Sequence, residues 1–297
     1  MNLRETLAGT GVAVVTPFAA DLSVDYAALG KLLDNLVEKG VEYIVTLGTT
    51  GETPVLSSEE KKEIIHFTQK QLNGHVPMVV GIGGNDTGSV INDLKSYPLD
   101  GAVAVLSASP YYNKPSQEGL FQHYRAIAEA SPKPVILYNV PGRTGRNMDA
   151  RTTLRLANEV SNIAGIKEAS GDMAQCMEIL RDRPEGFLVV SGDDALALPQ
   201  LACGMDGVIS VAANCFPKDF AEMVRLCLKN NFPEAKKIND RMIDAYHLMF
   251  AENNPSGAKA FLHEAGFMEN MVRLPVVPLS GGLHQAVKKF IAANNLS

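Results

Sequence analysis

The sequence predicts an α/β fold, a (β/α)8 TIM barrel with a C-terminal helical extension. Short apolar runs recur eight times along the chain, and segments with the spacing of an amphipathic helix lie between them. Because each run is almost uniformly apolar, the strands are expected to form a parallel sheet covered by helices. Eight such units favour closure into a barrel. An open, doubly wound sheet is the alternative, since periodicity alone does not exclude it.

The predicted strands are β-branched or apolar runs. In chain order they occupy residues 11–16, 43–47, 78–82, 102–107, 135–138, 163–167, 188–191 and 207–211. Helical spacing between them is clearest at Leu29, Leu32, Leu33, Leu36 and Val37. Gly40 follows as a helix stop. Ser57 and Glu60 have the spacing of a capping box, in which each side chain accepts from the other residue's backbone N–H, so a helix is expected to begin there.

The alternation of strands and helices stops near Phe232. The segments 234–250, 257–264 and 281–293 are predicted helices separated by turns that contain Pro or Gly. We therefore divide the chain into a catalytic barrel, residues 1–231, and a C-terminal helical extension, residues 232–297, packed on the barrel.

Composition and charge disfavour several classes of protein. The 297 residues are 46% hydrophobic, which is enough for one large core. A net charge of -6 disfavours nucleic-acid binding, which needs clustered Lys and Arg. No apolar run approaches the ~18 residues of a membrane-spanning helix, and the N-terminus lacks the pattern of a signal peptide. We expect a soluble, cytoplasmic protein with neither nucleic acid nor membrane as a partner.

The sequence contains no recognisable metal or nucleotide motif. The four cysteines, at positions 176, 203, 215 and 227, lack CxxC spacing and are expected to be small buried thiols. The six histidines are dispersed without an HExxH motif. GIGGND at residues 81–86 lacks the GxGxxG spacing, and no Walker motif occurs. We expect neither a metal ion nor a cofactor.

Polar residues follow the predicted strands at the end where a barrel enzyme has its active site. The loops at the C-terminal ends of barrel strands converge on one mouth, so catalytic groups gather there. The polar residues at these positions are Thr16, Thr49, Thr50, Asn85, Tyr111, Tyr112, Tyr138, Lys167, Ser191 to Asp194 and Ser210. We expect them to line one end of the barrel.

Lys167 is the most informative of these residues. It ends an apolar strand, so its ammonium group must either leave the barrel or lose its water inside it. Burial disfavours the charged form, and the neutral amine is the species that attacks a carbonyl carbon. A Schiff-base nucleophile and a structural lysine paired with Glu168 are both consistent with this position.

Tyr138, Arg143 and the threonine pair each have a chemical and an ordinary explanation. Tyr138 ends the preceding strand, where it either exchanges protons with the lysine or lies at the core boundary. Arg143, in the turn-rich sequence PGRTGR, either binds a carboxylate through two parallel hydrogen bonds or faces water. Thr49 and Thr50 either offer hydroxyl and N–H groups to a small carboxylate or form an ordinary turn.

Six ordered motifs resemble one known family. They are GTTGE at 48–52, SPYYNKPSQEG at 109–119, YNVPGRTG at 138–145, GIKEAS at 165–170, SGDD at 191–194 and GVISVAAN at 207–214. The chain is similar, nearly end to end, to the 4-hydroxy-tetrahydrodipicolinate synthase family of pyruvate-dependent lyases. The resemblance implies a TIM barrel, no cofactor, and a homo-oligomer that is a dimer or a dimer of dimers.

The resemblance also implies a reaction. Lys167 would form a Schiff base with pyruvate, and the derived enamine would attack the aldehyde of L-aspartate 4-semialdehyde, an early step towards diaminopimelate and lysine. Tyr138, Thr49 and Tyr112 would form a proton relay, with Tyr112 supplied by a neighbouring subunit.

The same resemblance implies a set of binding residues. Thr50 and Ile209 would contact pyruvate, with Thr50 at its carboxylate. Gly192 would shape the site, and Arg143 would hold the carboxylate of the aldehyde substrate. The segment NNPSGAK, residues 253–259, departs from the family pattern, and the sequence does not say what this changes.

Two other functions remain alternatives. N-acetylneuraminate lyase and the keto-deoxy-sugar-acid aldolases share the barrel, the lysine and the YN pair. The turn that supplies Arg143 resembles the synthases instead, because a sugar acceptor has hydroxyls where the semialdehyde has a carboxylate. A keto-acid-binding sensor barrel is the non-enzymatic alternative, but it would need no proton relay.

Lysine-inhibited members of the family carry histidines and a glutamate at an interface site. Here the matching positions are Ser58, Lys61 and Ser89, whereas Tyr111 and Asn85 of that site are kept. A cationic Lys61 and a missing carboxylate would repel the ammonium groups of L-lysine. We expect weak or absent inhibition by L-lysine.

Overall fold

Eight parallel strands form a closed barrel in the computed structural model, which describes residues 2–294. The strands are β1 (Gly9–Ala13), β2 (Tyr43–Thr46), β3 (Met78–Gly81), β4 (Ala102–Ala108), β5 (Val135–Asn139), β6 (Ile163–Glu168), β7 (Leu188–Ser191) and β8 (Gly207–Ser210). Each pairs in parallel with the next, and β8 pairs with β1. The barrel prediction is confirmed, and the open sheet is excluded.

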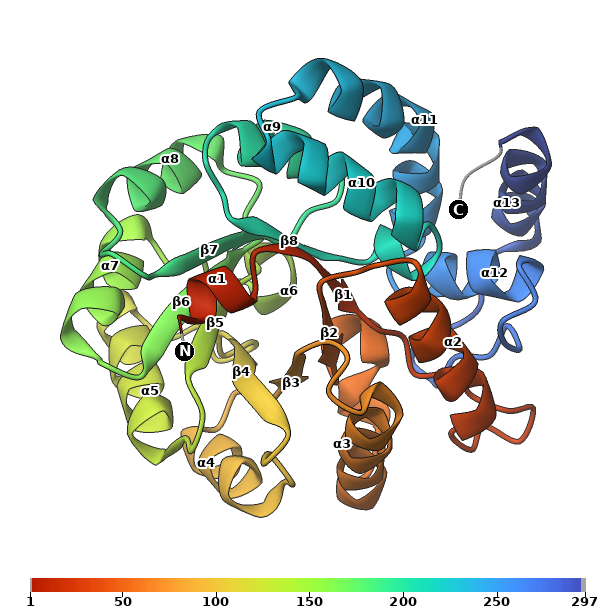
Figure 1. Ribbon diagram of the computed structural model, residues 1–297. Coiled ribbons are helices and arrows are strands. Elements are labelled where there is room, and N and C mark those ends of the chain that lie inside the picture. The colour runs from red at the N-terminus through yellow and green to blue at the C-terminus, as the bar shows by residue number, and fades with distance from the viewer. Residues whose placement is uncertain (1, 295–297) are drawn as a thin grey trace.

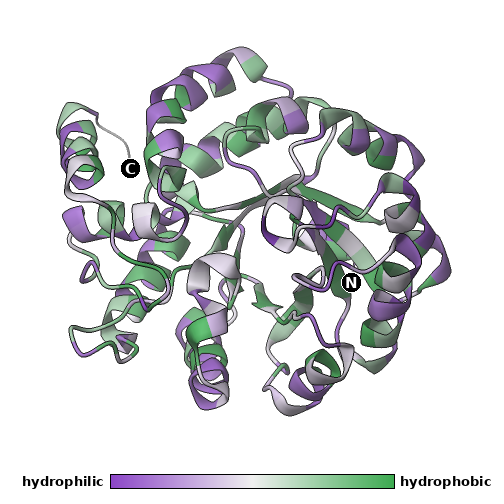
Figure 2. Ribbon diagram, turned by 180° about the vertical axis from the view of Figure 1, so that it is seen from behind, coloured by the Kyte–Doolittle hydropathy of each residue, from purple (hydrophilic) through white to green (hydrophobic). Residues whose placement is uncertain are grey.

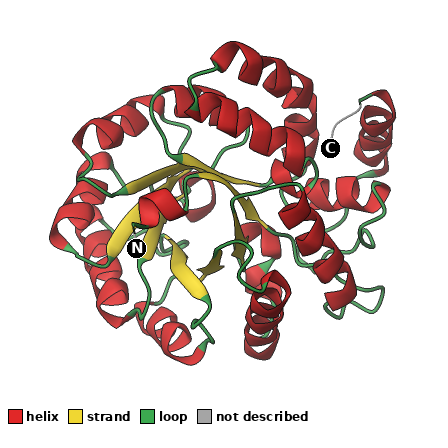
Figure 3. Ribbon diagram, in the orientation of Figure 1, coloured by secondary structure: helices red, strands yellow, loops and turns green. Residues whose placement is uncertain are grey.

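One main helix follows each strand and lies outside the barrel (Figures 1 and 3). These helices are α2 (Tyr26–Glu38), α3 (Ser58–Leu72), α4 (Thr87–Ser96), α5 (Gln117–Ala130), α7 (Ala150–Glu159), α8 (Met173–Asp182), α9 (Ala197–Ala202) and α10 (Pro217–Leu228). Shorter helical elements lie in the loops: η1 (Thr49–Gly51), η2 (Thr53–Val55), α6 (Pro141–Thr144) and η3 (Ala212–Asn214). In Figure 2 the strands are mainly hydrophobic and the outer faces of the helices mainly hydrophilic.

The predicted elements agree closely with the structure, with one misplaced strand. All eight strands occur, and the capping box at Ser57 and Glu60 is present. The first strand was placed at residues 11–16, but it begins at Gly9, which pairs with Gly207, and ends at Ala13. Thr16 therefore lies beyond the strand, where its hydroxyl donates to the carbonyl of Gly51 at 2.7 Å.

The barrel interior is filled by side chains and is covered at its N-terminal end. The interior cluster comprises Leu3, Leu7, Ala13, Tyr43, Val45, Val79, Ala104, Leu106, Ile136, Tyr138, Leu188, Val190 and Ile209. Leu3 belongs to the short helix α1 (Leu3–Thr6), which lies across the barrel in Figure 1. The Tyr43 ring needs a glycine opposite it, since a Cβ on Gly11 would lie 2.2 Å from two ring carbons.

A buried carboxylate ties the elements together at this N-terminal end. Asp206 accepts hydrogen bonds from Arg4 at 2.8 Å, from Arg183 at 2.5 Å and from the backbone N–H of Val189 at 2.9 Å. Polar residues at this end of a barrel stabilise the fold rather than perform chemistry.

The last part of the chain is helical, as predicted. It comprises α11 (Phe232–Phe250), α12 (Ser256–Glu264) and α13 (Gly281–Ala293), which contact one another beside α10 (Figure 1). Lys31 of α2 donates to the carbonyl of Gly266 at 2.8 Å, which joins this region to the barrel helices. The domain boundary between residues 231 and 232 stays a prediction.

The expectation of buried thiols was wrong for one cysteine. Cys176 and Cys227 are buried and Cys215 is half-buried, but Cys203 is exposed. Within residues 2–294, no helix is long and apolar enough to cross a membrane.

Candidate active site

A cavity of about 440 Å³ opens at the C-terminal ends of β2 to β5. Its walls are Leu47, Gly48, Thr49, Thr53, Pro54, Lys61, Gly81, Ile82, Gly83, Leu106, Ala108, Tyr111, Tyr138, Val140, Arg143 and Thr144. Five residues singled out from the sequence therefore share one cavity: Thr49, Lys61, Tyr111, Tyr138 and Arg143. Its position matches the mouth of a TIM-barrel enzyme.

Lys167 lies inside the barrel, beside the ring of Tyr138. The two residues are opposite each other in the pairing of β5 with β6. Lys167 is 5% exposed, and its Nζ lies 4.3 Å from the centroid of the Tyr138 ring. No salt bridge involves Lys167 among residues 2–294. The amine is thus buried beside a phenol and free of a carboxylate partner in the described chain.

Glu168, the alternative partner of that lysine, points to the other side of the strand. Its carboxylate accepts from Asn139 Nδ2 at 3.0 and 3.2 Å, from the Ser170 N–H at 2.7 Å and from Gln175 Nε2 at 3.0 Å. The pairing of Lys167 with Glu168 is therefore wrong. Neighbouring residues of a strand face opposite sides, so the outward Asn139–Glu168 pair fixes the inward Tyr138–Lys167 pair.

Sequence reasoning did not identify Asn139 as part of the site. It is a fully buried polar residue at the end of an apolar strand, and its Oδ1 accepts from the Met148 N–H at 3.0 Å. A buried amide of this kind needs partners on both sides. The sequence signal that could have identified it is its place, as a polar residue directly after Tyr138.

Gly192, directly after β7, borders the lysine side chain. A Cβ on Gly192 would lie 2.8 Å from Lys167 Cε and 2.7 Å from the Cβ of Ala169. Only a glycine therefore lets the lysine take this path. Ile209 is 1% exposed on β8 and belongs to the same interior cluster as Tyr138.

Asp194 holds the chain just after β8 through hydrogen bonds to its backbone. Its Oδ2 accepts from the N–H groups of Val211 and Ala212 at 3.1 and 2.8 Å. Burial raises the pKa of Asp194 to about 6, against the opposing effect of these hydrogen bonds. The carboxyl group thus fixes the chain that follows Ile209.

The threonine pair lies in η1, directly after β2. Thr49 is half-buried and lines the cavity, whereas Thr50 is 2% exposed. The Thr50 hydroxyl oxygen accepts from Asn254 Nδ2 at 2.9 Å. Asn254 comes from the segment before α12, so the C-terminal region reaches the site, which the sequence did not predict.

The same segment contacts Arg143. This exposed arginine of α6 donates through Nη2 to Asn253 Oδ1 at 2.9 Å and to the carbonyl of Asn254 at 3.3 Å. Its Nε and Nη1 have no hydrogen-bond partner among residues 2–294. One side of the guanidinium is therefore held, and the other is available to a ligand at the cavity.

Tyr112 does not join the other predicted relay residues within one chain. Its side chain is 89% exposed, it does not line the cavity, and its backbone has a φ of 70°. A bulky residue seldom adopts this left-handed conformation unless its surroundings hold it there.

The comparisons with known proteins agree on one family. The model of the Dihydrodipicolinate synthetase family matches residues 6–294. The 4-hydroxy-tetrahydrodipicolinate synthase of Parabacteroides distasonis is 51% identical over 272 residues, 92% of each chain. The crystal structure of dihydrodipicolinate synthase from Aquifex aeolicus superimposes with a TM-score of 0.94 and 36% identity, covering 98% of this chain and 99% of that one. The chloride-inhibited dihydrodipicolinate synthase from Acinetobacter baumannii, complexed with pyruvate, has a TM-score of 0.94 and 40% identity, covering 97% and 98%.

Proposed function

The chain belongs to the dihydrodipicolinate synthetase family, and we propose that it condenses pyruvate with L-aspartate 4-semialdehyde to give 4-hydroxy-tetrahydrodipicolinate. The observation that carries the proposal is the buried amine of Lys167, 4.3 Å from the Tyr138 ring centroid at the mouth of the barrel. A related structure that holds pyruvate supports the identity of the first substrate.

The chemistry begins at Lys167. Its neutral amine attacks the keto carbon of pyruvate to form a carbinolamine, and loss of water gives the imine. Removal of a methyl proton gives an enamine, whose carbon then bonds to the aldehyde carbon of the semialdehyde. The amino group of that substrate displaces the lysine as the ring closes, which regenerates the free amine.

Protons must leave and return at each of these steps. The Tyr138 ring lies beside the amine, and Tyr138 and Thr49 line the same cavity. A relay through Tyr138, Thr49 and Tyr112 supplies general acid and base groups without a metal ion.

The two substrates carry carboxylates that need separate partners. The buried hydroxyl and backbone of Thr50 suit the carboxylate of pyruvate, with Ile209 against the rest of that small molecule. Arg143 offers the unpaired edge of its guanidinium to the carboxylate of the semialdehyde. Gly192 leaves room for the lysine that carries the intermediate.

Tyr112 is assigned to the active site of a neighbouring subunit. Its exposed ring and its left-handed backbone are both explained if a second copy of the chain packs over it. A dimer is the smallest assembly that completes the relay, and a dimer of dimers is the assembly that we propose. We propose a cytoplasmic location for this enzyme.

The names of the relatives favour the synthase over the sugar-acid lyases. Arg143 at the cavity supports this choice, because a sugar aldehyde has no carboxylate for it to bind. The sensor alternative is not supported by any of the compared proteins described above.

Trapping with borohydride tests the proposal directly. Intact-protein mass spectrometry with and without pyruvate should show a reduced pyruvyl adduct in the wild type and none in Lys167→Ala. Arg143→Ala should keep the adduct but raise the KM for the semialdehyde by about tenfold or more, the loss of a charge-assisted pair. A wild type that forms no adduct would overturn the proposal.

A further inference from the structure

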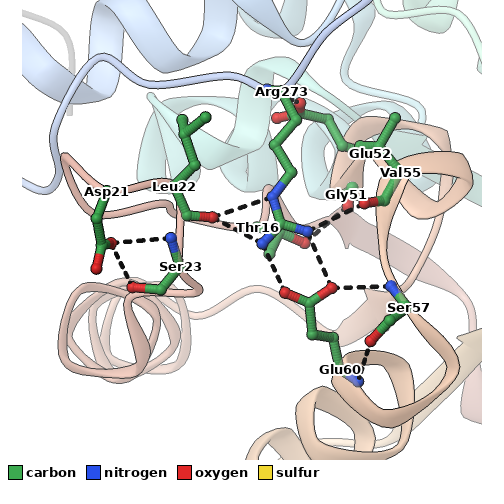
Figure 4. A network of polar contacts seen from close by, with 10 residues as sticks. All are labelled: Thr16, Asp21, Leu22, Ser23, Gly51, Glu52, Val55, Ser57, Glu60 and Arg273. Carbon is green, nitrogen blue, oxygen red and sulfur yellow. Dashed lines mark hydrogen bonds and ion pairs between the residues drawn. The ribbon is translucent and has the colours of Figure 1, made fainter.

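The loop that carries the two threonines ends at an unusual residue. Glu52 has a φ of 54°, in the left-handed region, and is 4% exposed. A non-glycine residue remains in this conformation only where its surroundings hold it. Figure 4 shows its position beside Gly51 and Arg273.

A buried lysine from the C-terminal region holds the carboxylate of Glu52. Lys259 of α12 is fully buried, and its Nζ lies 2.5 Å from Glu52 Oε1. The same Nζ donates to the carbonyl of Met271 at 2.8 Å and lies 4.1 Å from the centroid of the Phe18 ring. Burial lowers the pKa of Lys259 to about 8, and the neighbouring Glu52 opposes this.

The other oxygen of Glu52 is held by the backbone of Arg273, whose N–H donates to Oε2 at 2.9 Å. The Arg273 side chain pairs with Glu60 at 2.5 Å and donates to the carbonyls of Leu22 and Val55 (Figure 4). Two separate parts of the C-terminal region, α12 and the loop segment at Arg273, thus converge on one carboxylate.

A second bridge joins the same two regions. Asn254, five residues before Lys259, donates to the Thr50 hydroxyl oxygen at 2.9 Å. The C-terminal region therefore contacts the loop at Thr50 and at Glu52, on both sides of Gly51. Thr49 and Thr50 have little freedom to move while both bridges are formed.

Stability alone does not account for a buried pair at this position. A buried ion pair gains little over apolar side chains of the same volume, because both charges lose their water. The pair instead fixes an orientation, because a carboxylate with two partners fixes the orientation of the backbone that carries it.

We propose that Glu52 and Lys259 are positioning residues, and that their ion pair holds the Thr49–Thr50 loop in the orientation that binds pyruvate. The inference rests on the proposed function. It gives a role to the NNPSGAK segment, whose lysine and second asparagine contact this loop.

The double variant Glu52→Gln/Lys259→Met separates positioning from stability. Each single variant leaves one buried charge unpaired and should lower the melting temperature, whereas the double variant should recover most of that loss. Its loop nevertheless loses the ion pair and keeps only the Asn254 bridge, so the KM for pyruvate should rise by about tenfold or more and kcat should fall. The KM for the semialdehyde should change less than about twofold, because Arg143 is held by the Asn253 side chain and the Asn254 carbonyl, neither of which the double variant replaces.

Asp206→Asn is the matched control. It weakens a buried carboxylate–arginine cluster at the opposite end of the barrel. The melting temperature should fall while both KM values stay unchanged. Asn254→Ala provides a second variant that keeps the ion pair but frees Thr50, and it should also raise the KM for pyruvate.

The outcomes are distinct. A folded double variant with wild-type kinetic constants would overturn the inference, and so would an Asp206→Asn variant whose KM for pyruvate rises equally. A wild type that forms no borohydride-trapped adduct would instead overturn the proposed function, and the inference with it.

Discussion

The path of the Lys167 side chain depends on the residue opposite it. Gly192 has no Cβ. A Cβ at this position would clash with both Lys167 Cε and Ala169 Cβ. A displaced amine would meet the keto carbon of pyruvate at the wrong angle, and small displacements at a reacting centre cost about a hundredfold in rate.

Gly192→Ala should therefore slow formation of the pyruvate adduct by about tenfold to a hundredfold. Rapid quenching with borohydride at successive times, followed by intact mass, measures this rate. Gly281→Ala is the control, because a Cβ there would meet nothing within 4 Å. An unchanged rate in Gly192→Ala would show that the lysine tolerates another path.

At the scale of single elements, the start of α3 depends on a carboxylate that has two partners. Glu60 accepts from the Ser57 N–H at 2.8 Å, which completes the capping box, and it pairs with Arg273. The hydrogen bond from Arg273 is the main cause that lowers the pKa of Glu60 to about 2. A carboxyl group with a lowered pKa in the folded state stabilises the fold above its unfolded pKa, and this contribution disappears as the pH falls through the folded pKa.

Glu60→Gln should lower the free energy of unfolding by about 1–2 kcal/mol at pH 7, less than the full shift implies because the pair is partly hydrated. The glutamine keeps the capping box but loses the charge. The difference from the wild type should shrink as the pH falls from about 4.5 towards 2. Urea unfolding at several pH values measures it, with Glu59→Gln as the control. A difference that does not depend on pH would contradict the role of the ion pair.

The elements were largely predictable from sequence because their patterns are local. Strand runs, helical spacing and the Ser57–Glu60 box each depend on residues close together in the chain. The first strand was misplaced because its pairing with β8 is not visible in residues 9 and 10 alone. Asn254, Lys259 and Arg273 were not assigned to the site for a similar reason, since they meet residues more than 200 positions earlier.

In the candidate site, too, local patterns were predictable and contacts between distant residues were not. The positions of Lys167, Tyr138 and Gly192 follow from strand ends and family motifs, and the structure brings them together. Asn139 was missed, because only the fold shows that its amide faces Glu168 on the outside of the barrel. Tyr112 lies apart from the other relay residues because one chain contains only one side of the interface that we propose.

The whole molecule is expected to be active only as an assembly. Mixing Lys167→Ala, which should be inactive, with Tyr112→Phe, which should turn over slowly, under conditions that exchange subunits tests this. A mixed dimer has one site with both native residues and one with neither. Random exchange of equal amounts makes about half of the dimers mixed, so about a quarter of all sites are restored. Activity of the mixture should exceed the sum of the separate variants. No gain after verified exchange would place Tyr112 outside the relay.

Regulation is a second property of the whole molecule. Lys61 and Tyr111 both line the cavity, and the family resemblance implies that they match the site for L-lysine in inhibited relatives. Because Lys61 is cationic and the resemblance implies that a carboxylate of that site is missing here, we expect no submillimolar inhibition by L-lysine in steady-state assays. The Lys61→His/Ser89→Glu variant should gain sensitivity to L-lysine. Submillimolar inhibition of the wild type would contradict the prediction.

The contact between Glu52 and Arg273 also sets an order of events during synthesis. The two residues are 221 positions apart. At a synthesis rate of about 5–20 residues per second, Glu52 is therefore made roughly 10 to 40 s before Arg273. Lys167 is made about halfway through that interval, before the segment that contacts Glu52. The amine of Lys167 is thus made before the residues that hold the Thr49–Thr50 loop, so this loop is fixed only after α12 and the segment at Arg273 have docked.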